Sequence, residues 1–500
     1  MDHSYFIGVD VGTQGVRVGI SDENGSMRTV HESLYKTSYP RFGWAEQHPD
    51  DWWNGFIAAL SKCLADVSDD VRTAIRTLGV CGTSSTVLAI DSQGNPLGDA
   101  LLWMDSRATE EAAAINATRD EVLKYCGGEV SVEWMIPKTL WIKHHEPDLY
   151  AKAYKILEQV DFFNYRLTGV CCSSINIVTC KWNYVADRGG WDSGFFKRIG
   201  LEDYQEKIPI DVRKVGQLVG RIDPVLAQRF GLSPELQVIQ GATDACEATF
   251  GNGVVEPGSL ATIMGTSFVH QAVTADPIFQ KGIWGPFNKA LTDDYWMLEG
   301  GQISAGSIVG WLRDEFDITE PFSEFNRKAA EIPVGSDGLV VLDFFAGNRT
   351  PYKNPKLKGV IYGLRLNHTK YHVYRAVMES VAFGTRNIIE NFAGQGYQID
   401  RIVGSGGATK NEVWLQIMAD VTGKTITVNT CTDAGVLGHG VVGAVASGVY
   451  PDLRTAVDHM IHPARTYTPD PHNVATYDAL FKKYLSLYES LKDLMNSEEN

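Results

Sequence analysis

The chain has 500 residues, of which 44% are apolar and 21% are charged, and its formal net charge is -16. This length exceeds the size at which one hydrophobic core keeps growing, so two domains are expected. The acidic balance argues against non-specific binding of nucleic acid, which needs a basic surface. It does not exclude a small anionic ligand, because backbone amides, helix N-termini and a metal ion can outweigh the net field locally.

The eight cysteines form no C-x-x-C pair and no cluster with histidine at zinc spacing. Such usage is typical of a reduced intracellular protein. The first residues lack the basic region, apolar core and cleavage site of a secretory signal. No apolar run approaches the roughly 18 residues of a membrane span. We therefore expect a cytoplasmic protein with no membrane or nucleic-acid partner.

Residues 6–21 predict a β-hairpin in which two apolar runs flank a short turn. The turn contains Gly12 and Gly15, which let backbone N–H groups approach an anion, and Thr13, which adds a hydroxyl donor. Asp10 could hold Mg²⁺ directly or through water. A plain hairpin with a polar turn explains these residues equally well. A Walker-type loop, G-x-x-x-x-G-K-[ST], is absent, so any ATP site must use another architecture.

A helix is expected from Pro49, because apolar residues recur at helical spacing as far as residue 64. Residues 77–97 then repeat the arrangement of strand, small-residue turn and strand, and this turn carries the hydroxyl groups of Ser84 and Ser85. Strands that alternate with long helices indicate an α/β protein.

The segment Trp103-Met-Asp-Ser-Arg107 places an aromatic ring, an acid and a base within five residues. Asp105 and Arg107 could form hydrogen bonds with sugar hydroxyls, while Trp103 covers an apolar face of the sugar. A surface ion pair beside a core tryptophan is an equally good explanation. The local sequence leaves both interpretations open.

Asp244 follows an apolar strand expected at residues 236–239 and stands where a helix begins. The commonest role of aspartate at such a place is the helix N-cap, and the local sequence favours that role. A carboxylate at the end of a strand that faces a cleft could instead accept a proton from an attacking hydroxyl. The choice between the two stays open at this point.

Residues 258–276 predict a second hairpin, and its turn carries Gly265 and Thr266 in the same arrangement as the first. The repetition indicates two related halves, and a phosphate chain could bind between the two turns. Residues 404–408, with Asn411, offer a glycine-rich floor for a purine. A tight turn between a strand and a helix would need the same glycines.

Seven short motifs follow one another along the chain: Asp10-Val-Gly-Thr13, Gly43-Trp-Ala-Glu-Gln47, Trp103-x-Asp-x-Arg107, Gly241-x-x-Asp244, Met264-Gly-Thr266, Gly347-x-Arg-x-Pro351 and Gly406-Gly-Ala408. As an ordered set they resemble the FGGY carbohydrate kinases, from about residue 5 to residue 490. The resemblance implies an α/β fold of two ribonuclease-H-like domains, of the actin and hexokinase type, with the active site in the cleft between them. We expect residues 1–250 to form the sugar-binding domain with the first phosphate hairpin, and residues 251–500 the nucleotide-binding domain.

The same resemblance implies roles for individual residues. Asp10 would organise Mg²⁺, Thr13 would meet the terminal phosphates of ATP, and Asp244 would be the catalytic base. The nucleotide would contact Thr13, Gly265, Thr266, Gly306, Gly407, Ala408 and Asn411. The sugar would contact Asp244, Ser84, Ser85, Trp103, Asp105 and Arg107. Asp244 would take the proton of a terminal sugar hydroxyl during its attack on the γ-phosphorus, while Mg²⁺ and hairpin donors stabilise the charge.

The turn Gly82-Thr-Ser-Ser-Thr-Val87 bears on the identity of the acceptor. It lacks the Gln-Met-His-Gly of xylulokinases and the Gln-Arg-Glu of glycerol kinases, and it is similar to the Thr-Cys-Ser-Leu-Val of D-ribulokinases. We therefore expect ATP-dependent phosphorylation of a ketopentose, ribulose first, at its terminal hydroxyl (O5). The alternatives are a kinase for xylulose or for a polyol such as erythritol or glycerol, and a non-catalytic sugar sensor on the same fold. A homodimer is a family-level expectation.

Overall fold

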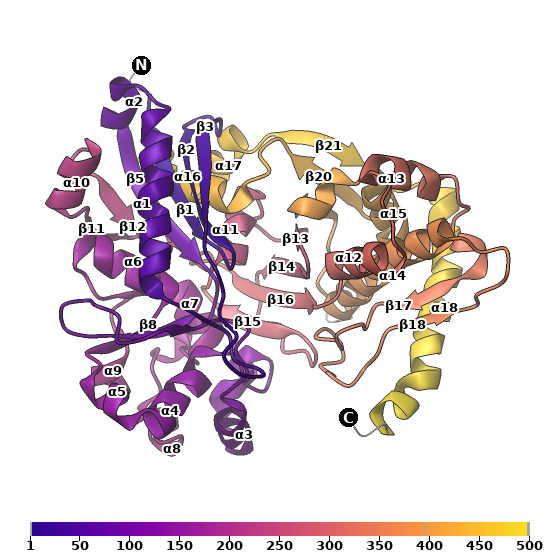
Figure 1. Ribbon diagram of the computed structural model, residues 1–500, viewed down its shortest axis with the longest axis horizontal. Helices are drawn as coiled ribbons and strands as arrows, with labels where there is room; N and C mark the ends of the chain where they lie inside the picture. Colours follow the sequence, from indigo (N-terminus) through magenta and orange to yellow (C-terminus); the bar gives the residue numbers. More distant parts are fainter. Residues whose placement is uncertain (1–2, 395, 498–500) are drawn as a thin grey trace.

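The computed structural model describes residues 3–394 and 396–497 and has two halves (Figure 1). The N-terminal half, in indigo and magenta, lies beside the C-terminal half, in orange and yellow. Each half is built on a mixed β-sheet flanked by helices. Among the described residues, no helix combines the length and the apolar character that a membrane crossing requires.

The first sheet contains the predicted N-terminal hairpin and has the strand order β11–β12–β5–β1–β2–β3. β1 and β2 are antiparallel, β3 extends them on one side, and β5 and β12 add parallel strands on the other. Almost every residue of β1 is buried, because helices cover the sheet, and this explains its unbroken apolar run. The bounds are β1 (Tyr5–Val11), β2 (Gly15–Asp22), β3 (Met27–Leu34), β5 (Ile75–Gly82), β11 (Leu218–Arg221) and β12 (Gln237–Ile239).

The second sheet repeats this plan in the order β15–β16–β14–β13–β19–β20–β21. An antiparallel hairpin, β13–β14, again carries a third antiparallel strand on one side and two parallel strands on the other. The repetition agrees with the two related halves predicted from the two Gly-Thr turns. The bounds are β13 (Ser259–Met264), β14 (Phe268–Thr274), β15 (Trp284–Asn288), β16 (Trp296–Gln302), β19 (Arg401–Ser405), β20 (Thr425–Asn429) and β21 (Pro463–Tyr467).

Helix α16 (Ala434–Ala446) belongs to the C-terminal part of the sequence but packs on β1 and β5 of the first sheet and on α11 (Asp244–Gly251), as Figure 1 shows. The backbones can approach one another closely because glycines stand at the points of contact. A Cβ at Gly438 would overlap the carbonyl oxygen of Glu247, and one at Gly8 would overlap that of Val436. The two halves are therefore joined by backbone-to-backbone packing at this crossing.

A smaller four-stranded sheet adjoins the first sheet and consists of β4 (Glu46–Gln47), β7 (Ala100–Leu101), β6 (Val87–Ile90) and β8 (Lys155–Glu158). The longer helices include α1 (Pro49–Ala65), α4 (Met135–His145), α6 (Gln159–Thr168), α12 (Gly306–Glu315), α14 (Lys370–Ala393), α15 (Glu412–Thr422) and α18 (Pro471–Ser497). The remaining helices and strands are α2 (Asp69–Thr73), α3 (Thr109–Ala117), α5 (Pro147–Lys152), α7 (Ile175–Lys181), α8 (Ser193–Arg198), α9 (Tyr204–Lys207), α10 (Pro224–Phe230), α13 (Phe322–Ala330), α17 (Leu453–Met460), β9 (Ser173–Ser174), β10 (Val212–Arg213), β17 (Val340–Leu342) and β18 (Val360–Tyr362).

Candidate active site

A cavity of about 220 Å³, the central pocket, is lined by residues of both halves. The first half supplies several residues predicted to bind a sugar or phosphate, namely Thr13, Ser84, Ser85, Trp103 and Asp244. The second half supplies Ser267, Val269, Glu299 and Arg349. The structure thus brings together side chains that lie far apart in the sequence, in a polar site between the two sheets.

Asp244 is the first residue of α11, and Thr243, not Asp244, is the N-cap of that helix. The N-cap interpretation of Asp244 was therefore wrong. Its Oδ1 accepts a hydrogen bond of 2.7 Å from the backbone N–H of Ala245. Burial, together with the nearby negative charge of Asp10, raises the pKa of Asp244 to about 7. A carboxyl group with this pKa can accept a proton near neutral pH.

Asp10 is the one half-buried residue of β1 and lies next to the first hairpin turn. Burial raises the pKa of its carboxyl group, while the positive charge of Arg17 opposes this shift. The described residues contain no group of three or more His, Cys, Asp or Glu side chains that could hold a metal ion. Mg²⁺ in phosphoryl-transfer sites is usually held by one or two carboxylates together with phosphate oxygens and water, so Asp10 fits such an ion.

Each of the two hairpin turns is closed by a hydrogen bond from the N–H of its glycine. The N–H of Gly12 donates to the carbonyl of Gly15 over 2.9 Å, and the N–H of Gly265 donates to that of Ser267 over 3.1 Å. Each turn therefore presents a tight loop of backbone with a threonine next to the glycine. The first turn lies at the central pocket through Thr13, whose hydroxyl oxygen accepts a hydrogen bond of 2.9 Å from the indole N–H of Trp103.

A second cavity, of about 550 Å³ and termed the glycine-walled pocket, lies beside the second hairpin turn. Six of the residues predicted to bind the nucleotide line it: Gly265, Thr266, Gly306, Gly407, Ala408 and Asn411. Residues that were not among the predicted nucleotide contacts complete its wall: Met264, Val309, Phe322, Asn326, Tyr374, Lys410 and Trp414. The pocket is mostly apolar, with few polar groups, as a site for a purine ring would be.

Two close contacts fix the wall of the glycine-walled pocket. A Cβ at Gly306 would overlap the carbonyl oxygen of Gly265, so only glycine lets α12 approach the second turn. Asn411 is the N-cap of α15, with its Oδ1 accepting from the N–H of Trp414 over 3.2 Å. Its amide N–H groups lie 3.1 Å from both Asn326 Oδ1 and Tyr374 Oη.

Asp105 and Arg107 do not line the central pocket. Asp105 is fully buried, and its carboxylate accepts hydrogen bonds from the backbone N–H of Ala45 over 2.7 Å and from Arg107 Nε over 2.8 Å. The guanidinium of Arg107 also donates to Glu46 over 2.7 Å and lies 3.6 Å from the ring centroid of Trp44. The pair is thus a buried ion pair that supports the Trp103 segment, and not the surface pair that the sequence also allowed.

Lys181 and Glu299 line the central pocket and were not singled out as site residues in the sequence. Lys181 Nζ lies 3.4 Å from Glu299 Oε1, and Gln271 donates to the other carboxylate oxygen over 3.0 Å. Lys181 stands in the stretch Cys180-Lys-Trp-Asn-Tyr184, which resembles the D-ribulokinase-type branch, but no role was predicted for it; Glu299 is marked only by the glycine pair that follows it.

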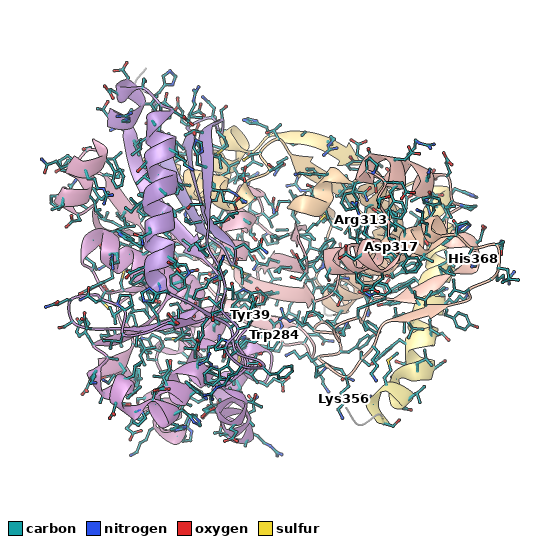
Figure 2. The ribbon with its side chains drawn as sticks, in the orientation of Figure 1. Tyr39, Trp284, Arg313, Asp317, Lys356 and His368 are labelled. Carbon is teal, nitrogen blue, oxygen red and sulfur yellow. The ribbon has the colours of Figure 1, made fainter. Side chains whose placement is uncertain are left out.

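An outer cavity of about 490 Å³ shares part of its lining with the central pocket, namely Glu133, Trp134, Lys181, Glu299 and Arg349. Arg349 and Glu133, from opposite halves, form an ion pair of 3.3 Å in this shared wall. The ring of Trp134 lies 5.1 Å from that of Trp284, which Figure 2 labels between the two halves. The outer cavity therefore adjoins the central pocket.

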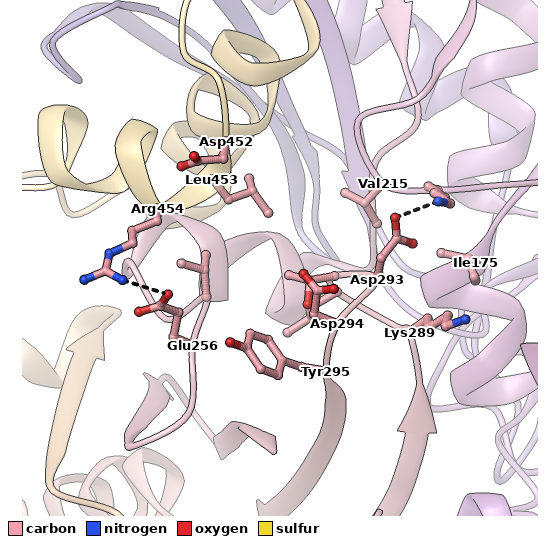
Figure 3. A pocket seen from close by; sticks show the side chains of 14 residues that line it. Ile175, Val215, Glu256, Lys289, Asp293, Asp294, Tyr295, Asp452, Leu453 and Arg454 are labelled. Atoms are coloured by element: carbon pink, nitrogen blue, oxygen red, sulfur yellow. Dashed lines mark hydrogen bonds and ion pairs between the residues drawn. The ribbon is translucent and has the colours of Figure 1, made fainter. Parts of the chain in front are cut away.

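Another cavity, shown in Figure 3, is lined by residues around the β15–β16 connection and the start of α17. Four of its charged side chains pair with one another: Lys214 with Asp293 over 2.6 Å, and Arg454 with Glu256 over 3.5 Å. These pairs neutralise part of the charge on its wall. We assign this cavity no ligand.

Comparisons with known proteins agree with this geometry. Models of the FGGY family of carbohydrate kinases match residues 5–251 (N-terminal domain) and residues 260–447 (C-terminal domain). The chain is 31% identical to ribulokinase from Shouchella clausii (strain KSM-K16), over 97% of this chain and 95% of that protein. It is 27% identical to xylulose kinase from Bacillus subtilis (strain 168), over 98% of each. The crystal structure of gluconate kinase from Lactobacillus acidophilus matches with a TM-score of 0.89 at 21% identity, over 98% of each chain. The predicted α/β fold with two domains and a cleft between them is confirmed.

Proposed function

The chain belongs to the FGGY family of carbohydrate kinases, and from this premise we propose that it transfers the γ-phosphoryl group of ATP to the terminal hydroxyl (O5) of a ketopentose, with ribulose as the preferred acceptor. The observation that carries the proposal is Asp244. This half-buried carboxyl group, with a pKa of about 7, lines a small pocket beside a Gly-Thr hairpin turn. In this proposal residues 1–250 bind the acceptor and residues 251–500 bind the nucleotide.

Asp244 acts as the general base. The acceptor hydroxyl lies in the central pocket and gives its proton to the Asp244 carboxylate as the oxygen attacks the γ-phosphorus. The hydrogen bond from Ala245 occupies Oδ1, which leaves Oδ2 for the proton. Burial between the two halves keeps water away from the reacting oxygen and limits hydrolysis of ATP.

The two hairpin turns receive the phosphate chain. Their backbone N–H groups and the hydroxyls of Thr13 and Thr266 are the donors available to phosphate oxygens. Asp10 would hold Mg²⁺, which when bound would neutralise the phosphate charge and orient the oxygens. The glycine-walled pocket would take the nucleoside, with Gly407 and Ala408 against the base.

The acceptor side of the central pocket favours a small polyhydroxylated molecule. The hydroxyl oxygens of Ser84 and Ser85 are buried there without a hydrogen-bond partner among the described residues. Lys181 and Glu299 add one charge of each sign to the same wall. Trp103 would cover an apolar face of the sugar. Asp105 and Arg107 would support Trp103 from behind without touching the sugar.

A coupled ADP-release assay with ATP and Mg²⁺ tests the proposal against D-ribulose, L-ribulose, D-xylulose, L-xylulose, ribitol, erythritol and glycerol. We expect the largest kcat/KM for one ribulose enantiomer, with the phosphate on O5 of the product by NMR. A larger value for a xylulose or a polyol would keep the kinase and reject ribulose. Sugar-induced thermal stabilisation without turnover would favour the sensor instead. The assay without sugar gives the background rate of ATP hydrolysis.

A further inference from the structure

Two charged side chains lie fully buried behind the turn that carries Ser84 and Ser85. Lys138, on α4, is 0% exposed, and Glu158, the last residue of β8, is 1% exposed. Burial lowers the pKa of Lys138 to about 8 and raises the pKa of Glu158 to about 7. A buried ion is costly unless hydrogen bonds compensate for the lost water, so its partners indicate what it stabilises.

Both ions bind the same residue of the turn. The carboxylate of Glu158 accepts hydrogen bonds of 2.6 Å from the backbone N–H of Ser85 and of 2.6 Å from the indole N–H of Trp182. The ammonium of Lys138 donates to the backbone carbonyl of Ser85 over 2.9 Å. The N–H and the C=O of Ser85 are therefore each held by a charged group.

Ser85 needs this support because its backbone is strained. Its φ is 62°, in the left-handed region that a residue with a side chain seldom adopts. In this conformation the hydroxyl groups of Ser84 and Ser85 are buried at the central pocket without a partner among the described residues. Thr83, which precedes Ser84, is also held, since its backbone N–H donates to the side-chain oxygen of Gln159 over 3.0 Å.

Lys138 also connects the turn to the second wall of the central pocket. Its ammonium donates to the carbonyl of Leu102 over 2.5 Å, one residue before Trp103. The same carbonyl accepts the N–H of Asp105 over 2.9 Å. One buried ammonium thus fixes the separation between the Ser84–Ser85 turn and the Trp103 segment.

We propose that Lys138 and Glu158 are positioning residues that determine which sugar the central pocket accepts, by holding Ser85 and the Trp103 segment in one geometry. This inference rests on the proposed function of the central pocket as the acceptor site. Neither residue lines that pocket, so both act through the turn.

The test compares Lys138→Met and Glu158→Gln with the wild type, using the panel sugar with the highest wild-type kcat/KM. We expect the KM for that sugar to rise at least tenfold and the ratio of kcat/KM between ribulose and xylulose to move at least fivefold towards one. The KM for ATP should stay within twofold. Glu379→Gln is the matched control, because Glu379 is a buried carboxylate that binds Gly335, Ser336 and Tyr477 in the other half of the molecule. It should lower the melting temperature without changing the sugar KM.

An unchanged sugar KM and an unchanged sugar ranking in folded variants would overturn the inference. If Lys138→Met does not fold, Glu158→Gln decides, because it keeps the size and shape of the side chain. If the wild type prefers another sugar, ribulose is rejected as the acceptor, and the KM comparison is made with the preferred sugar.

A wild type that phosphorylates no panel sugar would reject the proposed function, and hydrogen exchange would then show separately whether the two buried ions hold the turn. In Glu158→Gln the backbone amides of residues 80–90 should exchange at least tenfold faster, while those of β13 and β14 keep their rates. Equal exchange of residues 80–90 in both proteins would overturn the inference.

Discussion

Asp244 illustrates, at the scale of a residue, how burial sets the chemistry of a carboxyl group. The chain enters α11 past Gly241, where a Cβ would overlap the carbonyl of Val80, so the carboxyl group is held against the first sheet. Desolvation there raises its pKa to about 7. Below neutral pH the Asp244 carboxyl group is mostly protonated and cannot act as a base. Above neutral pH it is ionised and can accept a proton.

The first prediction concerns pH. Because Asp244 must be ionised to accept a proton, kcat/KM for the sugar should fall about tenfold for each pH unit below about 7 and level off above it. Steady-state ADP release between about pH 5.5 and about pH 8.5 measures this profile. A rate that is flat through neutrality would contradict the assignment of the raised pKa to the base.

Asp244 and Ser84 were predicted as site residues from the resemblance of their motifs to those of the family, since the local sequence at Asp244 favoured an N-cap. The sequence could not predict the pKa of Asp244, which depends on groups such as Asp10 and Glu299 that are distant in the chain. It also placed Asp105 and Arg107 at the sugar. The structure shows instead that Asp105 turns to the backbone of Ala45, a contact across 60 residues.

At the scale of elements, the hairpins were predicted because their apolar strands and glycine turns are local signals. The contacts that support the Ser84–Ser85 turn were not predicted, since Lys138 and Glu158 are 53 and 73 residues away from Ser85 in the sequence. Gly306 was predicted to contact the nucleotide, but the physical reason for a glycine there, the close approach of the turn at Gly265, could not be predicted. The elements themselves could be predicted from the sequence, but the contacts between them could not.

The second prediction is that Gly306→Ala raises the KM for ATP at least tenfold, because its Cβ would push the second hairpin turn away from α12. The KM for the sugar should change less than twofold. Gly310→Ala on the same helix is the control, since a Cβ there meets nothing within 4 Å. It should leave both KM values unchanged and stabilise the helix by about 0.5–1 kcal/mol. Equal ATP kinetics in the two variants would contradict the role of this contact.

At the scale of the whole molecule, the crossing of α11 and α16 connects the halves whose relative position forms the central pocket. α11 carries Asp244 at its start, and α16 passes Asp10, with the position of a Cβ at Gly435 only 3.4 Å from that carboxylate. The repeated hairpins predicted two related halves, but the glycine contacts that join them depend on tertiary packing. Residues on both sides of this crossing therefore contribute to the geometry of the candidate active site.

The third prediction is that Gly438→Ala destabilises the protein by about 1–3 kcal/mol, because the added methyl group would force α16 away from the Glu247 backbone. Thermal unfolding followed by circular dichroism measures the loss. Gly98→Ala serves as the control, since its Cβ would have only an ordinary contact at 3.8 Å with Leu149. Two variants with the same melting temperature would show that the crossing tolerates displacement.

The most direct test of the central claim is the turnover of Asp244→Asn beside the wild type, with ribulose, ATP and Mg²⁺ at saturating concentrations. Removal of the general base should lower kcat by about 10²–10⁴-fold. The melting-temperature increases caused separately by sugar and by ATP should remain, because asparagine keeps the size of the side chain. Near-normal turnover in Asp244→Asn would contradict the account, since the proton would then have another acceptor.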